Sequence, residues 1–484
     1  MSVTTHPFDD DRLHEECAVF GIYGHDEAAQ HSTLGLHALQ HRGQEAAGIV
    51  TYDGERFHAH RDLGLVGDIF SDPAVMRRLP GHAAIGHTRY STTGEPMLRN
   101  VQPLFADLDL GGLAIAHNGN LTNARTMRQE LVSSGCIFQS TTDTEIIIHL
   151  MATTQGTIVE RLISAIRRIE GAYSLVTLTK EGLIGVRDPL GVRPLVLGKL
   201  DNTYILASES CAFDIVGAER VRDVEPGELL VISEKGVKSY FPFPKLEKRC
   251  CIFEFIYFAK PDSVIDGLSI YESRKKIGRE LARESRTEAD VVVPVPDSGV
   301  PAAIGFAAEA GLPYELGIIR NHYVGRTFIE PTSEIRHFGV RLKHNANRAI
   351  LNGKRVILVD DSIVRGTTSK KIVEMVRAAG ATEVHMRISS PPTTNPCFYG
   401  VDTPDKDQLL AANLDVDGIR DEIAADSLAF VTIDGLYRAM GEGARDNKRP
   451  QFCDACFSGE YPIRLTDQQN GDASAQLSLL SESG

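Results

Sequence analysis

The sequence contains no run of about 18 apolar residues, the length that a helix needs to cross a bilayer. Residues 1–16 also lack the apolar stretch of a secretory signal and carry several acidic side chains instead. We therefore expect a cytoplasmic protein that has no membrane partner.

Basic residues are too few to balance the acidic ones: 51 Lys and Arg stand against 65 Asp and Glu, which gives a net charge of −14. This balance disfavours nonspecific binding to nucleic acid or to anionic membranes. An anionic ligand must therefore be bound by local donors. A disulfide framework is also excluded, because the cytoplasm keeps thiols reduced, so the eight cysteines are candidates for ligand or nucleophile roles.

A chain of 484 residues exceeds the size of one typical domain, so we expect two domains. Residues 17–245 consist of short apolar runs separated by Gly-rich turns, which predicts a strand-rich domain with helices near 28–40 and 143–153. The segment FPFPKLEK, residues 241–248, concentrates proline and charge, which favours a domain boundary near residue 245.

Residues 246–464 alternate short apolar strands with amphipathic helices, a pattern typical of a mostly parallel α/β sheet. Ligands of such sheets bind at the carboxyl ends of the strands. Residues 465–484 are polar and poor in large apolar side chains, so we expect a disordered tail.

The segment VILVDDSIVRGTTS places two carboxylates, Asp360 and Asp361, directly after an apolar strand at 356–359. Paired carboxylates at such a position are costly unless a cation or hydroxyl groups compensate them, which indicates Mg²⁺ or a sugar as their partner. Residues 365–369 then offer backbone N–H groups, hydroxyls and the start of a helix near Ser369, which together form a phosphate cradle. A pair that merely caps the helix is the alternative, and the loop that follows disfavours it.

This segment closely resembles the signature of type I phosphoribosyltransferases. The resemblance implies that Asp360 and Asp361 contact the ribose of phosphoribosylpyrophosphate (PRPP) and its Mg²⁺, and that the following loop holds the 5′-phosphate. In DVVVPVPDSGVPAAIGFA, residues 291–293 predict a strand and Val300 a helix start, and the loop between them resembles the family's pyrophosphate loop, with Ser298 beside the metal. The implied PRPP-binding set is Asp297, Ser298, Gly299, Asp360, Asp361, Ser362, Arg365, Gly366, Thr367 and Thr368, with Ser298, Asp360 and Asp361 near Mg²⁺. The basic segment 320–343 resembles the loop that closes over PRPP.

Cys17 stands in EECAVFGIYG and is followed by HRGQEAAG, GHTRYSTTG, AHNGNL and STTDTE. In this order the motifs resemble the N-terminal-nucleophile glutaminase domain shared by several amidotransferases. Amide hydrolysis needs a nucleophile, a base, donors for the oxyanion and groups that recognise the substrate. The resemblance implies that Cys17 attacks glutamine, with its own α-amine as base; Asn118 and Gly119 form the oxyanion hole, Arg89 binds the carboxylate and Asp143 the ammonium. Arg42, His87 and Thr92 belong to the same motifs and are given supporting roles.

Cys17 is preceded by sixteen residues, and its amine is blocked while they remain attached. Some relatives carry such a leader and remove it autocatalytically between Glu and Cys, so we expect residues 1–16 to be removed. The alternative is a frayed extension that leaves Cys17 inert.

Cys453 and Cys456 have C-x-x-C spacing, and Cys251 and Cys397 would complete a Cys₄ set compatible with zinc or an iron–sulfur cluster. Leader-bearing members of the amidotransferase family carry a [4Fe–4S] cluster, and the family motif matches CIFEFIYFAKPDS, residues 251–263. The resemblance therefore implies one structural [4Fe–4S] cluster per subunit on Cys251, Cys397, Cys453 and Cys456, with Cys250 spare.

Taken together, residues 15–462 resemble the glutamine PRPP amidotransferase family. The implied fold is a glutaminase sandwich with αββα layers followed by a type I phosphoribosyltransferase α/β domain. The implied reaction transfers ammonia from glutamine to PRPP, giving 5-phosphoribosylamine, pyrophosphate and glutamate at the start of purine synthesis. A homotetramer and feedback by purine nucleotides are further implications. The alternatives are an amidotransferase with another second half, such as glucosamine-6-phosphate synthase, and a PRPP-binding regulator without chemistry.

Overall fold

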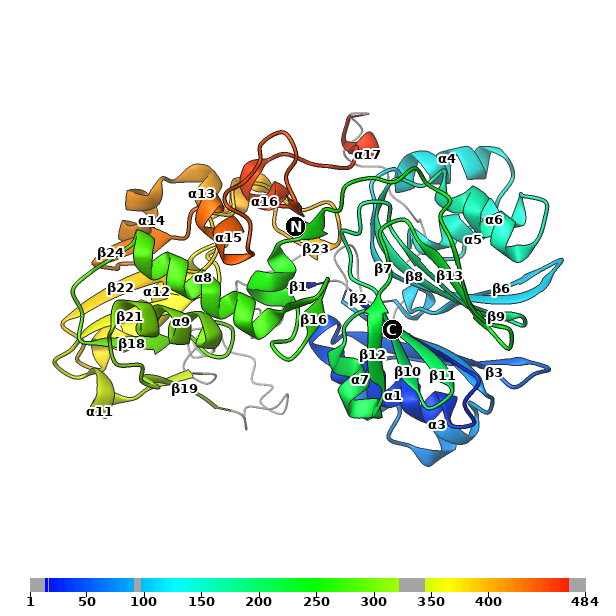
Figure 1. Cartoon of the computed structure of the whole chain (residues 1–484), viewed down its shortest axis with the longest axis horizontal. Helices are drawn as coiled ribbons and strands as arrows, with labels where there is room; N and C mark the ends of the chain where they lie inside the picture. The colour runs from blue at the N-terminus through cyan, green and yellow to red at the C-terminus, as the bar shows by residue number, and fades with distance from the viewer. Residues whose placement is uncertain (1–13, 16, 91–96, 322–343, 470–484) are drawn as a thin grey trace.

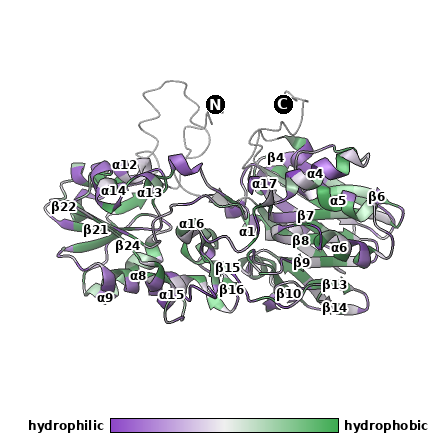
Figure 2. Cartoon of the chain, turned by 90° about the horizontal axis from the view of Figure 1, so that it is seen from above, coloured by the Kyte–Doolittle hydropathy of each residue, from purple (hydrophilic) through white to green (hydrophobic). Residues whose placement is uncertain are grey.

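The computed structural model describes residues 14–15, 17–90, 97–321 and 344–469. These residues form two bodies that lie side by side in both views (Figures 1 and 2). The first body contains two antiparallel sheets of seven and six strands. In spatial order, the seven strands are β12 (Glu219–Asp223), β10 (Val196–Leu200), β11 (Thr203–Ala207), β2 (Cys17–Tyr23), β5 (Ala83–Arg89), β3 (Ala46–Tyr52) and β4 (Phe57–Leu63). The six strands are β14 (Gly236–Tyr240), β13 (Leu229–Ser233), β9 (Gly182–Arg187), β8 (Gly171–Thr179), β7 (Gly111–Leu121) and β6 (Leu104–Leu108).

The two sheets pack face to face, because side chains alternate along each strand and every second one is apolar and points between the sheets. Val19, Ile85 and Ala116 belong to this inner core. Helices α1 (Ala28–Ala38) and α7 (Cys211–Val216) cover the outer face of the larger sheet, and α5 (Thr144–Ala152) and α6 (Ile158–Ile166) cover that of the smaller one. The layers are therefore αββα, as predicted. The remaining short elements of this body are η1 (Gln40–Arg42), α2 (Val66–Ile69), α3 (Pro73–Arg77), η2 (Leu98–Asn100) and α4 (Ala124–Ser133).

The second body is built on a parallel sheet, which confirms the predicted α/β class. Its strands, in spatial order, are β18 (Val291–Pro294), β21 (Arg355–Asp360), β22 (Glu383–Ile388) and β24 (Ser427–Phe430). Helices α8 (Ile270–Glu284) and α9 (Val300–Ala310) cover one face, and α12 (Thr367–Ala378) and α14 (Val416–Glu422) cover the other. Because both faces are covered, β21 is a continuous apolar run at residues 356–359.

Smaller elements complete the second body. They are β15 (Cys250–Cys251), η3 (Glu254–Phe258), β16 (Val264–Ile265), β17 (Leu268–Ser269), β19 (Ile318–Arg320), β20 (His344–Ala346), α11 (Arg348–Leu351), β23 (Val401–Asp402), η5 (Lys406–Gln408), α13 (Leu410–Asn413), α15 (Ile433–Ala439), β25 (Phe452–Cys453), α16 (Ala455–Ser458) and α17 (Thr466–Gln469). Residues 241–249, where we place the domain boundary, form neither helix nor strand. The short strand β1 (His14–Glu15) pairs with β23, so residues 14–15 lie against the second body.

Two boundaries differ from the prediction. Helix α12 starts at Thr367 rather than near Ser369, because Gly366 adopts a left-handed conformation with φ of 81° and ends the preceding turn. The expected disordered tail does not start at residue 465: α17 is helical and packs on α4, since Asp467 accepts hydrogen bonds from the backbone N–H groups of Arg125 (2.7 Å) and Thr126 (3.0 Å). Residues 470–484 lie outside the described residues, as do most of the predicted PRPP loop (322–343) and Thr92. Among the helices of the described part of the chain, none has the length and hydropathy to span a membrane.

Candidate functional site

Cys17 begins β2, where it is paired in register with Arg89 at the end of β5. Residues two apart in a strand share a face, so Cys17 points to the same side as Val19, and Arg89 to the same side as Ile85. Val19 and Ile85 both belong to the core between the two sheets. The nucleophile candidate and the carboxylate-binding candidate therefore face the space between the sheets, and Cys17 is only 8% exposed.

Asn118 faces the same space from the opposite sheet, because it lies two residues beyond Ala116 on β7. The ring nitrogen Nε2 of His87, on β5, lies 3.1 Å from the carbonyl oxygen of His117, on β7. This part of β5 therefore lies opposite the part of β7 that carries Asn118. Asn118 is fully buried, and its amide nitrogen and oxygen have no hydrogen-bond partner among the described residues. A buried amide without a partner is costly, which indicates that a ligand completes its hydrogen bonding.

Gly119 can only be glycine at this point in the strand. Its φ is 139°, and a Cβ atom would lie 2.0 Å from the carbonyl oxygen of Ala172. On its other side Gly400 approaches so closely that a Cβ there would lie 3.0 Å from Cα of Gly119. The neighbouring Asn120 donates from Nδ2 to the carbonyl oxygen of Phe398 at 3.0 Å. The second body therefore fixes the backbone that follows Asn118.

The two proposed glutamine-recognition residues are linked by hydrogen bonds from Arg89 to Thr141 and by the short stretch of chain from Thr141 to Asp143. Arg89 donates from Nη1 to the carbonyl oxygen of Asn100 at 2.6 Å, and the Asn100 side chain bonds to the N–H and hydroxyl of Thr141 at 3.0 and 2.9 Å. Asp143 lies two residues further on and accepts the N–H of Leu121 at 2.9 Å. Burial raises the pKa of Asp143, but His117 and these hydrogen bonds outweigh it and lower the pKa, so the carboxylate is anionic.

His87 is a weak base at this position. It is fully buried, and burial followed by the charge of Arg89 lowers its pKa to about 3, so it is neutral near pH 7. A base for Cys17 must therefore be found elsewhere.

Asp360 and Asp361 lie at the carboxyl end of β21, as predicted. Asp361 accepts the hydroxyl of Ser362 at 2.6 Å on one oxygen, while its Oδ1 is buried and has no partner among the described residues. Next to them, α12 starts with Thr367 and Thr368 and has no side-chain cap from Gly366. A buried carboxylate oxygen without a donor, beside an uncapped helix N-terminus, can bind a cation or hydroxyl together with a phosphate.

The loop 297–299 reaches the same edge of the sheet. Val295 donates its N–H to the carbonyl oxygen of Val359 at 2.9 Å, and a Cβ atom at Gly299 would lie 2.3 Å from that oxygen. Asp297 forms an ion pair with Arg320 at the end of β19. β19 and β20 pair with Arg320 opposite His344, and His344 Nε2 lies 3.4 Å from the carbonyl oxygen of Pro296, so both strands reach this loop. Arg365, by contrast, is exposed and faces Gln408, with a 3.4 Å bond from its Nη2 to Oε1.

The four cysteines of the proposed cluster come from three segments that meet in the second body. β15 and β25 run parallel, with Cys251 opposite Cys453 and Cys250 opposite Phe452. Burial, with a contribution from Cys397 and against Arg193, raises the pKa of Cys251 to about 12. Burial and the other three cysteines raise the pKa of Cys456 well above its usual range. Cys250 instead lies beside Asp266 and Arg187.

No three His, Cys, Asp or Glu side chains in the described part of the chain are arranged to hold one metal ion. A single tetrahedral zinc ion needs sulfurs about 2.3 Å from its centre, whereas an iron–sulfur cluster holds its thiolates farther apart. Two of the four thiols, Cys251 and Cys453, are buried and the other two are partly buried, and such a set of soft donors is of the kind that zinc and iron–sulfur clusters use.

A buried ionic cluster that the sequence did not reveal joins the two bodies. Arg42, of the motif HRGQEAAG, donates to Glu209 and, from Nη2, to Glu254 at 2.6 Å. Arg193 lies 3.8 Å from Glu254. The side chains of all four residues are fully buried. Arg42 is 212 residues from Glu254 in the chain, so only the fold brings them together.

Arg274 continues this connection toward the PRPP candidate site. It lies in α8, is almost fully buried, and donates to the carbonyl oxygens of Phe255 (3.1 Å), within η3, and Ala259 (2.7 Å), directly after η3. Burial lowers the pKa of Arg274 to about 10, although Asp361 opposes the shift. Sequence reasoning missed Arg274, Glu209 and Arg193, because no local motif marks them.

Known families and relatives match this arrangement. A glutamine amidotransferase domain model matches residues 87–214, and a phosphoribosyl transferase domain model matches residues 267–389. The chain is 57% identical over 99% of its length to an amidophosphoribosyltransferase of Rhizobium etli, of which 98% is covered. It is 49% identical over 94% of its length to that of Bacillus subtilis, of which 95% is covered.

Among solved structures, the chain is similar to the glutamine PRPP amidotransferase from B. subtilis complexed with ADP and GMP. The TM-score is 0.88 and the identity 48%, and the match covers 93% of this chain and 98% of that one. A structure described as the allosteric regulatory enzyme of purine biosynthesis matches with a TM-score of 0.89 and 48% identity, covering 93% of this chain and 97% of that one.

Proposed function

Because the chain belongs to the amidophosphoribosyltransferase family, we propose that it transfers ammonia from glutamine to PRPP, giving 5-phosphoribosylamine, pyrophosphate and glutamate. This is the first committed step of de novo purine synthesis. The observation that carries the proposal is the presence, in one chain, of two buried polar groups without partners, each among the residues of its own motif: the Asn118 amide and Oδ1 of Asp361.

In the glutaminase half, the sulfur of Cys17 attacks the side-chain carbonyl of glutamine. The oxyanion that forms accepts hydrogen bonds from the Asn118 amide and the Gly119 N–H, which are held rigidly and therefore need little reorganisation. Arg89 binds the substrate carboxylate and Asp143 its ammonium. The leaving nitrogen takes a proton and departs as ammonia, and water then releases glutamate from the thioester.

The base in this step is the α-amine of Cys17, whose pKa of about 7.7–8.0 in free termini suits neutral pH. It exists only after residues 1–16 are removed, so the active protein begins at Cys17. The low pKa of the buried His87 supports this assignment, because it makes His87 too weak a base to take the proton of Cys17. Pairing of β1 with β23 holds the leader beside the nucleophile before its removal.

In the second half, Asp360 and Asp361 bind the ribose hydroxyls, and residues 365–368 with the N-terminus of α12 bind the 5′-phosphate. The loop 297–299 binds the pyrophosphate. Mg²⁺ usually binds to one or two carboxylates plus substrate phosphates, so Asp360 and Asp361, with Ser298 nearby, suffice to hold it, and it neutralises charge on the pyrophosphate. Ammonia attacks C1 of the ribose, and the C1–O bond to pyrophosphate breaks.

Ammonia passes between the sites through the protein rather than through solvent. The contact of Asn120 with Phe398, and of Gly119 with Gly400, supports this, because the oxyanion strand lies directly on the second domain. We infer that the glutaminase domain comprises residues 17–245 and the phosphoribosyltransferase domain residues 246–464.

Cys251, Cys397, Cys453 and Cys456 hold one [4Fe–4S] cluster, which cross-links the start and end of the second domain and has no redox part in the reaction. The register of Cys251 with Cys453 supports Cys251 over Cys250 as the ligand. Purine nucleotides act as feedback regulators, as the ADP and GMP bound to the B. subtilis relative suggest. The functional assembly is a homotetramer.

Two variants test the proposal. Cys17→Ala should abolish glutamine-dependent pyrophosphate release while sparing release driven by a high concentration of ammonium salt, because only nitrogen supply passes through the thiol. Asp361→Asn should lower both activities. Equal loss of both activities in folded Cys17→Ala protein would refute the assignment of glutamine hydrolysis and ribose transfer to two separate sites. If intact mass showed Met1 at the start of fully glutamine-active protein, the α-amine of Cys17 could not be the base.

A further inference from the structure

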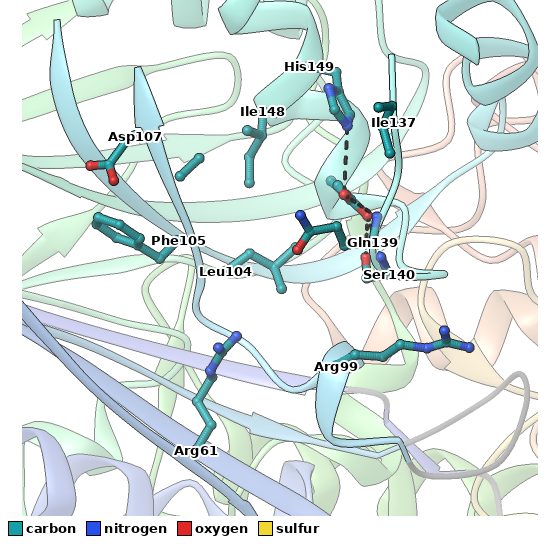
Figure 3. A pocket seen from close by; sticks show the side chains of 12 residues that line it. Arg61, Arg99, Leu104, Phe105, Asp107, Ile137, Gln139, Ser140, Ile148 and His149 are labelled. Carbon is teal, nitrogen blue, oxygen red and sulfur yellow. Dashed lines mark hydrogen bonds and ion pairs between the residues drawn. The ribbon is translucent and has the colours of Figure 1, made fainter. Parts of the chain in front are cut away.

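A cavity of about 520 Å³ opens on the glutaminase domain, and Cys17, Arg89 and Asn118 are not among the residues that line it. Its walls come from β4, η2, β6, the segment 137–140 and α5 (Figure 3). None of the residues assigned above to glutamine or to PRPP lines it. A cavity of this volume suits a small organic molecule.

The cavity contains a partly buried cation that has no acidic partner. Arg61, on β4, donates from Nη1 to the carbonyl oxygens of Val101 (3.2 Å) and Pro103 (3.4 Å), and it forms no ion pair among the described residues. Burial lowers the pKa of Arg61, and no nearby acid opposes the shift. Figure 3 shows the guanidinium pointing toward Leu104 and Gln139. A desolvated cation of this kind is stabilised when an anion binds to it.

The acidic residues of the cavity do not compensate Arg61. Glu145 accepts the N–H groups of Gln139 and Ser140 at 2.8 and 2.7 Å and lies 3.6 Å from Nε2 of His149. Burial raises the pKa of Glu145, but these partners outweigh it and lower the pKa to about 2. Asp107 is exposed and points away from Arg61 (Figure 3).

The rest of the lining is mixed: an apolar part stands beside the polar side chains of Arg99, Gln139, Ser140 and His149. Leu104 and Ile148 are buried, Phe105 is 39% exposed, and Ile137 is 82% exposed at the mouth. An isoleucine so exposed beside a cavity offers a contact for the apolar part of a ligand. Together with Arg61, the lining fits a small molecule that has one anionic group and a compact apolar body.

The lining of the cavity includes chain neighbours of the residues that position Arg89 and Asp143. Arg99 of the lining precedes Asn100, whose carbonyl oxygen holds Arg89. Ser140 and Glu145 of the lining lie on either side of Asp143 in the chain. A ligand that pushes on these walls would therefore shift Arg89 and Asp143 together.

We propose that this cavity binds a small amphipathic carboxylate and that its occupancy changes the affinity for glutamine. The first part stands on the cavity alone, whereas the second rests on the proposed glutaminase function. Ammonia-dependent synthesis should not respond, because it does not use Arg89 or Asp143.

The test uses benzoate as the probe, with benzyl alcohol and inorganic phosphate as partial mimics, and calorimetry on the full-length protein. Benzoate should bind, and Arg61→Gln should weaken its binding about tenfold, as expected for loss of a charge-assisted hydrogen bond. The exposed Arg56→Gln, directly before β4, should have no effect. Ile137→Ser, which changes an exposed side chain and so leaves the fold intact, should also weaken binding.

Benzoate should in addition change KM for glutamine without changing the ammonia-dependent rate. Absence of benzoate binding at millimolar concentration, or equal binding by Arg61→Gln, would overturn the site. Equal binding of inorganic phosphate would overturn the amphipathic class, and binding without a change in KM would overturn the coupling. If the protein bound benzoate but did not use glutamine at all, the proposed function would fail while the site stood.

Discussion

Replacement of Arg42 by Met should destabilise the protein far more than replacement of any surface arginine, because Arg42 lies between two buried carboxylates. Burial alone would lower the pKa of Arg42, but Glu209 and Glu254 overcome it and raise the pKa above its ordinary value. Removal of one partner from a buried ion pair costs about 3–5 kcal/mol, since the remaining charge is left uncompensated. Here two carboxylates would lose a partner. Arg193, 3.8 Å from Glu254, and His41, 2.7 Å from Glu209, would remain close to them.

Such a loss is a large part of a domain's stability of about 5–15 kcal/mol. It corresponds to a fall in melting temperature of about 10 °C for a domain of this size. Differential scanning calorimetry should show this fall for Arg42→Met, and the added changes Glu209→Gln and Glu254→Gln should restore most of it by removing the stranded charges. Arg168→Met is the matched control, because Arg168 pairs with Glu130 at the surface, where both side chains are about half exposed and such pairs contribute about 0–1 kcal/mol.

If Arg42→Met melts with the wild type, or if Arg168→Met shifts the melting temperature equally, the buried pairs do not hold the two bodies together. A fall in stability that the triple variant does not reverse would also contradict the electrostatic explanation, because it would indicate lost packing instead.

Three further predictions follow from single positions. The pKa of His87 is about 3 in the folded state and about 6.5 in the unfolded one, so the stability that neutral His87 contributes is present above pH 6.5 and is lost as pH falls. Between pH 7 and 5 the free energy of unfolding of the wild type should fall by about 2 kcal/mol through this group. In urea titrations His87→Gln should remove this pH dependence, whereas the exposed His37→Gln should keep it. Gly400→Ala should lower the glutamine-dependent kcat about tenfold to a hundredfold and spare the ammonia-dependent rate, because its Cβ displaces the Gly119 backbone. The control variant Gly441→Ala, at a similar positive φ and with no neighbour within 4 Å, should leave the glutamine-dependent kcat unchanged. Equal rates for the two variants would refute the role of the contact between Gly400 and Gly119. Iron and sulfide analysis should find a full cluster in Cys250→Ser and none in Cys251→Ser, and zinc in the wild type would refute the cluster.

The fold class and the local site motifs could be predicted because their signals are short in sequence. The strand at 356–359, the acidic pair and the loop that follows occupy fourteen consecutive residues, so the sequence places carboxylates at a strand end and hydroxyls at a helix start without any knowledge of the fold. Even there the start of α12 differs by two residues, because the conformation of Gly366 is not visible in a pattern of polar and apolar residues.

The connection between the domains could not be predicted, because it depends on residues far apart in sequence. Arg42 and Glu254 stand in motifs that sequence reasoning assigned to separate domains, and each motif was interpreted only within its own domain. Arg274 carries no motif, and its α8 position predicts only an amphipathic helix with exposed cations. Its burial and its approach to Asp361 follow from the packing of α8 on η3.

The segment 397–402 contacts three parts of the proposed machinery: the thiols of the proposed cluster, the proposed oxyanion strand and residues 14–15. Cys397 belongs to the group of thiols, Phe398 accepts from Asn120, and Gly400 lies against Gly119. Residues 401–402 pair with the strand that precedes Cys17. Consecutive Cα atoms are about 3.8 Å apart, so Gly400, three residues after Cys397, lies only a short length of chain from the thiol and touches Gly119. If the proposed cluster fixes Cys397, it would therefore also help to fix the backbone of Gly119, whose N–H is proposed to bind the oxyanion. An iron–sulfur centre without redox chemistry would then have a physical part in amide hydrolysis.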